Sequence, residues 1–212
     1  MGLLQRLFGG PGAGFERPWL EYPLLAVDLE MNSLDPETGA IVSIGAVGIE
    51  DGEVCLSTAS HWLIEATESV GESAIIHGIT DTERRSGVTL AQALTELQAV
   101  AADHVLIFHH AFLDLRFLEA ALDRLGLQPL DAPHIDTMKL EQRRLERSGQ
   151  PLPHDSLLLS QCRQRYDLPV YPAHNALHDA LSTAELAIVQ FRQMSGSKPL
   201  PLSSFVERAR PL

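Results

Sequence analysis

Four acidic residues and one histidine stand where the chain could build a single chemical site. Asp28 and Glu30 lie two residues apart at the end of an apolar run, so on a strand their side chains project from the same face. Asp114 falls in the first turns of a predicted helix, and Asp179 opens the last long helix, with Asn175 as its predicted N-cap. Each signal alone is weak, because acidic residues are common in turns and caps. Together they indicate a carboxylate cluster.

Such a cluster suits a pair of hard divalent cations. Carboxylates gathered over an apolar sheet repel and desolvate one another, and divalent cations offset that cost. Mg²⁺ and Mn²⁺ prefer oxygen ligands, and two such ions can stabilise the attacking and the leaving oxygen of a phosphoryl displacement. A base is then needed for the attacking water, and His174, five residues before Asp179 in a proline-containing loop, is well placed to act as that base.

The hydrophobic pattern predicts the elements that position these residues. Leu24-Leu25-Ala26-Val27 is typical of a strand buried on both faces, and residues 41–49 and 54–64 predict two more strands joined by a tight turn at Asp51-Gly52. Further along, strands are predicted over residues 105–108 and near Ile135. Helices are predicted over residues 90–101, 112–125, 156–165 and 176–194, and a charged helix is predicted from the strand near Ile135 through about residue 147. Three hairpin strands followed by alternating strands and helices predict an α/β fold. Its mixed sheet has three antiparallel strands, then parallel strands, and is flanked by helices.

Length and composition predict one domain with short ends. The chain has 212 residues, 45% hydrophobic and 21% charged, values typical of a soluble globular protein with a full core. The glycine-rich stretch 9–14 predicts a flexible arm over residues 1–20, which leaves one folded domain over 21–195 and a tail over 196–212. Neither a membrane span nor a signal peptide is recognised, so we expect a cytoplasmic protein without membrane association.

The formal net charge of −12 argues against a protein that coats nucleic acid with a broad basic face. It leaves room for an enzyme that acts at one strand end, because a carboxylate cluster that loads cations reverses its own local sign. Basic residues gather at 84–85, along 139–147 and at 163–165, and most are interpreted as solvated helix faces.

With these residues placed, the chain resembles the DEDD exonuclease superfamily in its histidine-bearing DEDDh branch, which includes bacterial proofreading subunits. The resemblance covers about residues 22–194. Three ordered motifs carry it: Asp28-Leu29-Glu30 with Ile44-Gly45-Ala46-Val47, then residues 109–118, then His174-x-Ala176-x-x-Asp179-Ala180. Ile76-His77-Gly78-Ile79-Thr80 and Ile135-Asp136-Thr137 also match the family pattern.

The resemblance implies a ribonuclease H-like fold and a 3′-to-5′ exonuclease that releases nucleoside 5′-monophosphates from a nucleic acid 3′ end, with single-stranded DNA favoured and RNA possible. It implies that two Mg²⁺ or Mn²⁺ ions are held by four carboxylates, with a histidine as general base: Asp28, Glu30, Asp114, Asp179 and His174. It also implies a pocket for the terminal nucleotide lined by Leu29, Met31, His77 and His109.

Some residues depart from the family pattern. Met31-Asn32-Ser33 stands where proofreading members tend to carry Thr-Thr-Gly, and His110 and Leu113 stand where Asn and Phe are usual. The third motif also differs from the HRAxxDI form of oligoribonucleases. These departures leave the chemistry intact and leave the choice between DNA and RNA open.

Alternative functions also follow from the residues. His178-Asp179 resembles the metal site of HD phosphohydrolases, but that fold is all helical and the first third of this chain is rich in predicted strands. The chain could also be a catalytically silent exonuclease-like module that only holds a partner, although all five proposed site residues are present. Residues 201–205 resemble short apolar peptides that dock on sliding clamps, which gives a polymerase or clamp partner as a further expectation.

Overall fold

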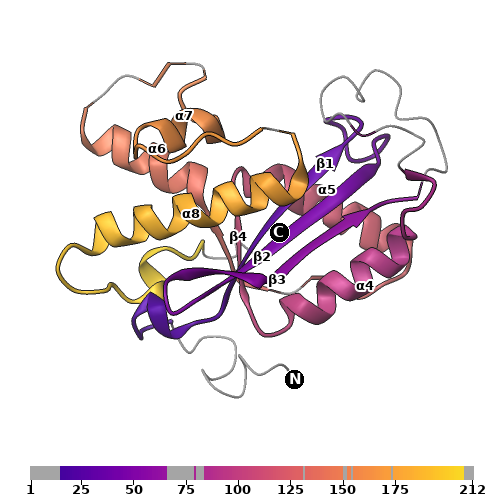
Figure 1. The fold of residues 1–212 in the computed structure, drawn as a ribbon, viewed down its shortest axis with the longest axis horizontal. Helices are drawn as coiled ribbons and strands as arrows, with labels where there is room; N and C mark the ends of the chain where they lie inside the picture. The colour runs from indigo at the N-terminus through magenta and orange to yellow at the C-terminus, as the bar shows by residue number, and fades with distance from the viewer. Residues whose placement is uncertain are drawn as a thin grey trace.

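The computed structural model of the chain describes residues 15–65, 79, 84–130, 132–149, 152–153, 155–172 and 174–207. These residues form a five-stranded mixed sheet in the order β3-β2-β1-β4-β5 (Figure 1). β1 (Leu24–Met31), β2 (Ile41–Glu50) and β3 (Glu53–Leu63) are antiparallel neighbours, whereas β4 (Val105–Phe108) and β5 (His134–Asp136) run parallel to β1. This confirms the predicted α/β class and excludes the all-helical fold of HD phosphohydrolases.

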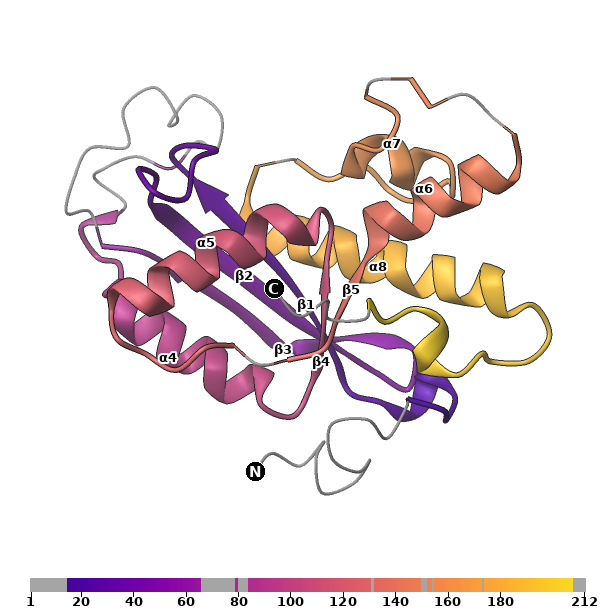
Figure 2. The same ribbon diagram turned by 180° about the vertical axis from the view of Figure 1, so that it is seen from behind.

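Helices cover both faces of the sheet (Figures 1 and 2). One face carries α4 (Leu90–Ala101) and α5 (Ala111–Arg124), and the other carries α8 (Ala176–Ser195) with α6 (Thr137–Arg147) and α7 (Leu159–Gln164) beside it. The alternation of β1 explains the two layers, because Leu25 and Val27 pack towards α4 and α5 while Leu24 and Ala26 pack towards α8. In the described part of the chain, no helix combines the length and apolar character needed to cross a bilayer.

Local sequence signals set most element ends. α4 begins after Thr89, whose side chain accepts a hydrogen bond from the Gln92 N–H at 3.2 Å. Asp51 and Gly52 both have positive φ angles, 52° and 76°, as a two-residue hairpin turn requires. α7 is shorter than predicted from residues 156–165, because Leu158 is extended and the helix starts only at Leu159.

Both ends of the described chain pack onto the core, which differs from the predicted free arm and tail. Trp19 donates its backbone N–H to the Leu200 carbonyl at 3.0 Å, and its ring lies 5.2 Å from that of Phe191. Phe205 packs on the same ring at 4.3 Å, and both Phe205 and Leu202 are fully buried. The apolar residues of the stretch that resembles a clamp-binding peptide are therefore used in the core, and the short helix η3 (Leu202–Ser204) forms part of this packing.

Candidate active site

The two carboxylates of β1 lie at the carboxyl end of that strand, on the face that α8 covers. Asp28 is directly opposite Gly45 of β2, and Glu30 is directly opposite Ser43. The intervening Leu29 is buried in the core cluster on the α4 and α5 side. The alternation of side chains along β1 therefore places both acids on the face that α8 covers and the apolar Leu29 on the opposite face.

The start of α8 brings Asp179 to the same place. The side chain of Asn175 accepts a hydrogen bond from the His178 N–H at 3.1 Å, which confirms the predicted N-cap. Asp179 follows in the first turn, and carboxylate oxygens of Asp28, Glu30 and Asp179 lie within 4.8 Å of one another. Three acids at such distances repel strongly unless protons or cations separate their charges.

A glycine allows α8 to come this close. A Cβ atom built on Gly45 would lie 2.2 Å from the carbonyl carbon and oxygen of Ala176 and 2.4 Å from the Leu177 nitrogen. Because Gly45 is the β2 partner of Asp28, the helix start rests on the sheet immediately beside that carboxylate. The glycine of the first motif therefore determines how closely Asp179 approaches Asp28.

Asp114 joins the cluster from the first turn of α5. Its side chain is buried, with 4% exposure, and its charge raises the pKa of Asp28. Glu30 in turn contributes to raising the pKa of Asp114. The fourth predicted carboxylate therefore interacts electrostatically with both acids of β1.

Asp136 at the end of β5 holds the start of α5 and of α6 at once. Its two oxygens accept the backbone N–H groups of His110 and Ala111, both at 3.1 Å, and one of them also accepts the Met138 N–H at 3.0 Å. The side chain is 1% exposed. Asp136 is the N-cap of α6, a role that its position directly before a predicted helix could have indicated.

The structure also explains why Asn is usual at the position of His110. His110 has a φ angle of 78°, in the left-handed region that Asn adopts more readily than most residues. His110 occupies this conformation as the residue that precedes α5. The departure from the family pattern therefore concerns backbone strain at the helix start.

Burial raises the pKa of all four carboxyl groups, and neighbouring carboxylates raise the pKa of Asp28, Glu30 and Asp114 further. Burial is the main reason that the pKa of Asp28 lies well above its ordinary value, followed by the charges of Asp114 and Asp179. The pKa of Glu30 is raised to about 7, first by burial and then by Asp179. Burial also raises the pKa of Asp114 and of Asp179, and in Asp179 the His174 N–H opposes that effect. Glu30 therefore titrates near neutral pH, so a bound cation competes with its proton.

The donor set fits hard divalent cations. All the groups that converge are oxygens, the ligands that Mg²⁺ and Mn²⁺ prefer. Beside them, the hydroxyl of Ser43 is completely buried and has no hydrogen-bond partner among the described residues. An orphaned hydroxyl opposite Glu30 is satisfied if ion binding changes the orientation of that carboxylate or brings water to it.

His174 lies next to the carboxylates with an exposed side chain. Its backbone N–H donates to Oδ2 of Asp179 at 2.9 Å, and its φ angle is 65°, in the left-handed region. Four residues further on, His178 is also exposed. The structure thus places the predicted base in the loop directly before α8, tied through its backbone to a predicted metal ligand.

The structure describes three of the four residues predicted to line the nucleotide pocket. The side chain of Leu29 lies in the core on the opposite face from Asp28, and Met31 packs against the same core cluster. His77 lies outside the described residues. The side chain of Leu29 therefore does not face the carboxylates, as the alternation of side chains along a strand already indicates.

His109 uses both ring nitrogens within the protein. Nδ1 lies 2.8 Å from the Thr137 hydroxyl, and Nε2 lies 2.8 Å from the Leu157 carbonyl. Burial lowers the pKa of His109, which favours a neutral ring, and because a carbonyl can only accept, the ring proton lies on Nε2. His109 therefore connects the start of α6 to the segment that leads into α7.

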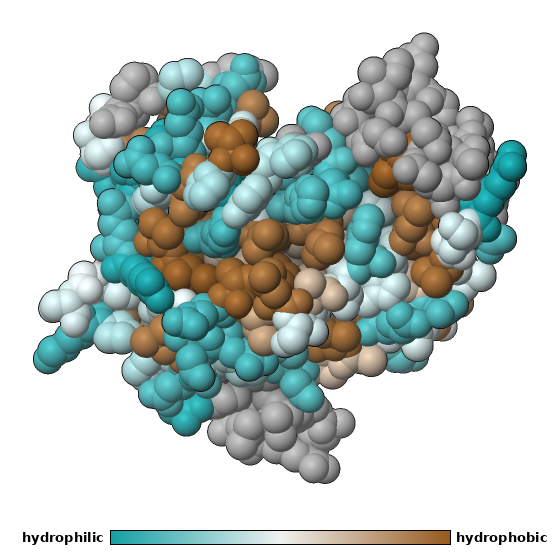
Figure 3. Space-filling model, in the orientation of Figure 1, coloured by the Kyte–Doolittle hydropathy of each residue, from teal (hydrophilic) through white to brown (hydrophobic). Residues whose placement is uncertain are grey.

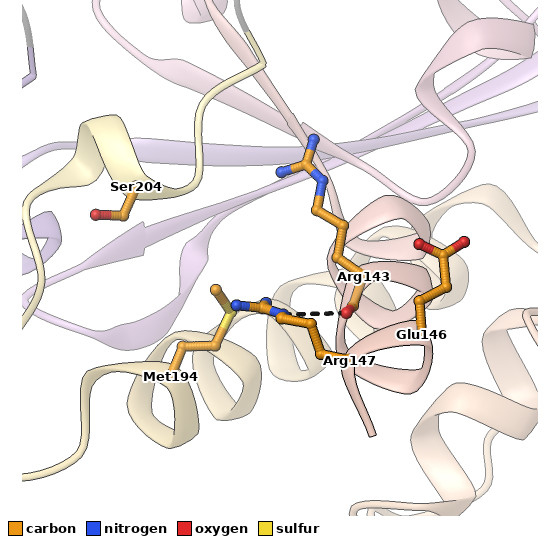
Figure 4. A pocket seen from close by; sticks show the side chains of 5 residues that line it. All are labelled: Arg143, Glu146, Arg147, Met194 and Ser204. Carbon is orange, nitrogen blue, oxygen red and sulfur yellow. Dashed lines mark hydrogen bonds between the residues drawn. The ribbon is translucent and has the colours of Figure 1, made fainter. Parts of the chain in front are cut away.

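A separate pocket of about 510 Å³ lies at the other end of α8, between the carboxyl ends of α6 and α8 (Figure 4). Met194 on its wall is 15 residues from Asp179 along one helix, or about 22 Å at 1.5 Å per residue. The pocket is therefore distinct from the carboxylate cluster. Its lining residues are Arg143, Glu146, Arg147, Met194 and Ser204.

Comparison with known proteins identifies related sequences. The exonuclease family model RNase_T matches residues 25–187. The DNA polymerase III PolC-type of Thermotoga petrophila is 28% identical over 163 residues, which are 76% of this chain and 11% of that protein. The corresponding protein of Halalkalibacterium halodurans is 27% identical over 170 residues, 80% of this chain and again 11% of that protein. The chain thus spans about a tenth of the length of these relatives.

Solved structures share the fold. The nuclease domain of 3′hExo, a DEDDh family member bound to rAMP, gives a TM-score of 0.72 at 13% identity, covering 91% of this chain and 99% of that chain. Exonuclease X in complex with 5′ overhanging duplex DNA gives 0.64 at 21% identity, covering 85% and 98%. These likenesses confirm the ribonuclease H-like arrangement of the sheet and helices.

Proposed function

Because the chain belongs to the exonuclease family whose model it matches over residues 25–187, we propose that it is a metal-dependent 3′-to-5′ exonuclease releasing nucleoside 5′-monophosphates. The observation that carries the proposal is the convergence of three carboxylates within 4.8 Å, with the buried Asp114 interacting electrostatically with Asp28 and Glu30. A merely structural fold has no need to crowd acids whose mutual repulsion opposes folding.

Asp28, Glu30, Asp114 and Asp179 would hold two Mg²⁺ or Mn²⁺ ions. When bound, such ions stabilise the negative charge that develops on the attacking and leaving oxygens of a phosphodiester. The orphaned Ser43 hydroxyl and the raised pKa values of the carboxyl groups both support this assignment.

His174 is the proposed general base. It takes a proton from the water that attacks the terminal phosphorus, the bond from phosphorus to the upstream 3′ oxygen breaks, and that oxygen takes a proton from solvent to leave as a hydroxyl. The hydrogen bond from the backbone N–H of His174 to Asp179 supports this role, because it holds the loop that carries His174 next to a proposed metal ligand. The exposed ring is accessible to solvent water.

The names of the relatives support a nucleic acid substrate. The curated relatives are DNA polymerases, exonuclease X was solved with duplex DNA, and 3′hExo was solved with a ribonucleotide. Of these, the curated relatives have the highest identity, and they favour DNA as the substrate.

Digestion of strands that carry a labelled 3′-terminal nucleotide tests the proposal. Matched single-stranded DNA, duplex DNA and RNA are incubated with Mg²⁺, with Mn²⁺ and with chelator, and labelled mononucleotide is the expected product only when cations are present. Asp28→Ala and Asp179→Ala should abolish release, while Asp123→Asn, an exposed acid on the helix that carries Asp114, should retain it.

Two results would count against the proposal. Full activity of Asp28→Ala would contradict the assignment of the ligands. Absence of release by the parent chain with either cation on any of the three substrates would instead favour a catalytically silent module.

A further inference from the structure

A row of three residues crosses the sheet beside the carboxylates. Asp28 of β1 is directly opposite Gly45 of β2, and Gly45 is directly opposite His61 of β3. Directly opposite residues project from the same face, so His61 lies on the α8 side of the sheet. At about 4.8 Å per strand, its backbone is about 10 Å from that of Asp28.

The start of α8 lies over the middle of this row. The space that a side chain on Gly45 would fill is taken by the backbone of Ala176 and Leu177. His178 follows in the same turn, and the side chains of His61 and His178 are both exposed. Desolvation and then the charge of His178 lower the pKa of His61. Two histidines, one on β3 and one in the first turn of α8, therefore lie at the same helix start.

Five of the eight basic groups noted in the sequence pair with acids of the protein. Lys139 and Arg143 pair with Glu207, and Arg163 pairs with Glu185 at 2.7 Å. The buried Glu141 pairs with Arg144 at 2.6 Å and with Arg165 at 3.3 Å. Because the chain has a net charge of −12, side chains near the carboxylates that can donate a hydrogen bond to a phosphate are candidates for substrate binding.

We propose that His61 and His178, with the N-terminal end of α8, bind a backbone phosphate of the substrate strand upstream of the scissile bond. The proposal rests on the proposed exonuclease function. At about 3.4 Å of rise per nucleotide in a stacked strand, a separation of about 10 Å places this phosphate two or three nucleotides from the cleaved one. Imidazole N–H groups donate to phosphate oxygens, and the helix dipole of α8 adds a favourable potential.

Two substrates separate this subsite from the metal site. The p-nitrophenyl ester of thymidine 5′-monophosphate presents one phosphate and reports on the carboxylates alone, whereas an oligothymidylate also reaches the subsite. For His61→Ala we expect the ratio of kcat/KM on the oligonucleotide to kcat/KM on the ester to fall about tenfold, the equivalent of one hydrogen bond to a charged group. The loss should appear in KM, and His61→Asn, which keeps an N–H donor, should restore part of it.

His178→Gln gives an independent measure should His61→Ala fail to fold, and it should lower the same ratio. His104→Gln is the matched control, because His104 bonds the Val100 carbonyl at the end of α4, away from the carboxylates. An unchanged ratio in both subsite variants overturns the proposal. So does an equal loss on both substrates with weaker Mn²⁺ binding, which would show that His61 acts through the metal site. A parent chain inactive on both substrates would overturn the exonuclease function, and the subsite with it.

Discussion

The close approach of α8 to Gly45 yields the sharpest prediction. In Gly45→Ala the new Cβ would lie 2.2 Å from the backbone of Ala176, whereas ordinary contact begins near 3.4 Å, so the two backbones must separate by about 1.2 Å. Both groups are main chain, so no side-chain rotation relieves the clash. Overpacking of this kind costs about 1 to 3 kcal/mol.

The displacement falls on the helix that carries Asp179. A misplacement of about 1 Å in a catalytic constellation reduces rates by about 10²-fold, so we expect kcat of Gly45→Ala to fall by about that factor. The Mn²⁺ concentration for half-maximal activity should rise, because Asp179 moves away from Asp28. Thermal unfolding should occur only about 2 to 4 °C lower per kcal/mol lost, so the protein stays folded at assay temperature.

Mononucleotide release as a function of Mn²⁺ concentration, together with thermal unfolding followed by circular dichroism, measures both effects. Gly126→Ala is the matched control: its Cβ meets nothing within 4 Å, but its φ angle of 64° penalises alanine. It should lower the unfolding temperature and leave the Mn²⁺ dependence intact. If Gly45→Ala keeps both the kcat and the Mn²⁺ dependence of the parent, the reasoning that Gly45 positions Asp179 is refuted.

Three further outcomes are expected. Because the folded pKa of Glu30 is raised to about 7 from 4.5, its protonation stabilises the metal-free fold below pH 4.5, and this stability is lost as pH rises through 7. Unfolding temperatures measured in chelator should therefore fall over that range, less so in Glu30→Gln, and added Mg²⁺ at pH 8 should reverse the fall. His174→Ala should lower the single-turnover rate by about 10² to 10⁴ while Mn²⁺ binding measured by calorimetry persists. Asp136→Ala should lose about 1 to 3 kcal/mol in denaturant unfolding, because it leaves buried N–H groups unpaired, and Asp136→Asn should recover part of that loss.

Much of the fold could be predicted because local signals and periodicity agree. α4 occupies the predicted residues 90–101, where an N-cap threonine precedes a clear helical repeat. The convergence of Asp28, Glu30 and Asp179 could also be predicted, since strand alternation and a helix start fix where their side chains point. The direction of each of these side chains follows from one element alone, whereas the distance between Asp28 and Asp179 depends on how β2 and α8 pack.

The remaining features depend on contacts between distant segments. The packing of Leu202 and Phe205 on Phe191 involves too few residues to leave a periodic pattern, so composition indicated a tail. The role of Gly45 depends on α8, more than 130 residues further along the chain. Leu29 is a different case, because its position between two acids of a strand already places it on the opposite face, although the family resemblance implied a pocket residue.

The hydrogen bonds of Asp136 imply that the two sides of the site, the start of α5 and the start of α8, differ in local stability. Its bond to the Ala111 amide is buried, whereas the bonds that fix the start of α8, from the His178 amide to Asn175 and from the His174 amide to Asp179, are exposed to solvent. Fraying at the α8 side should therefore precede opening at the α5 side. In hydrogen exchange, the amide of Ala111 should be protected longer than that of His178. The start of α8, next to the proposed base, is then the side of the site that opens when a strand end enters or a nucleotide leaves.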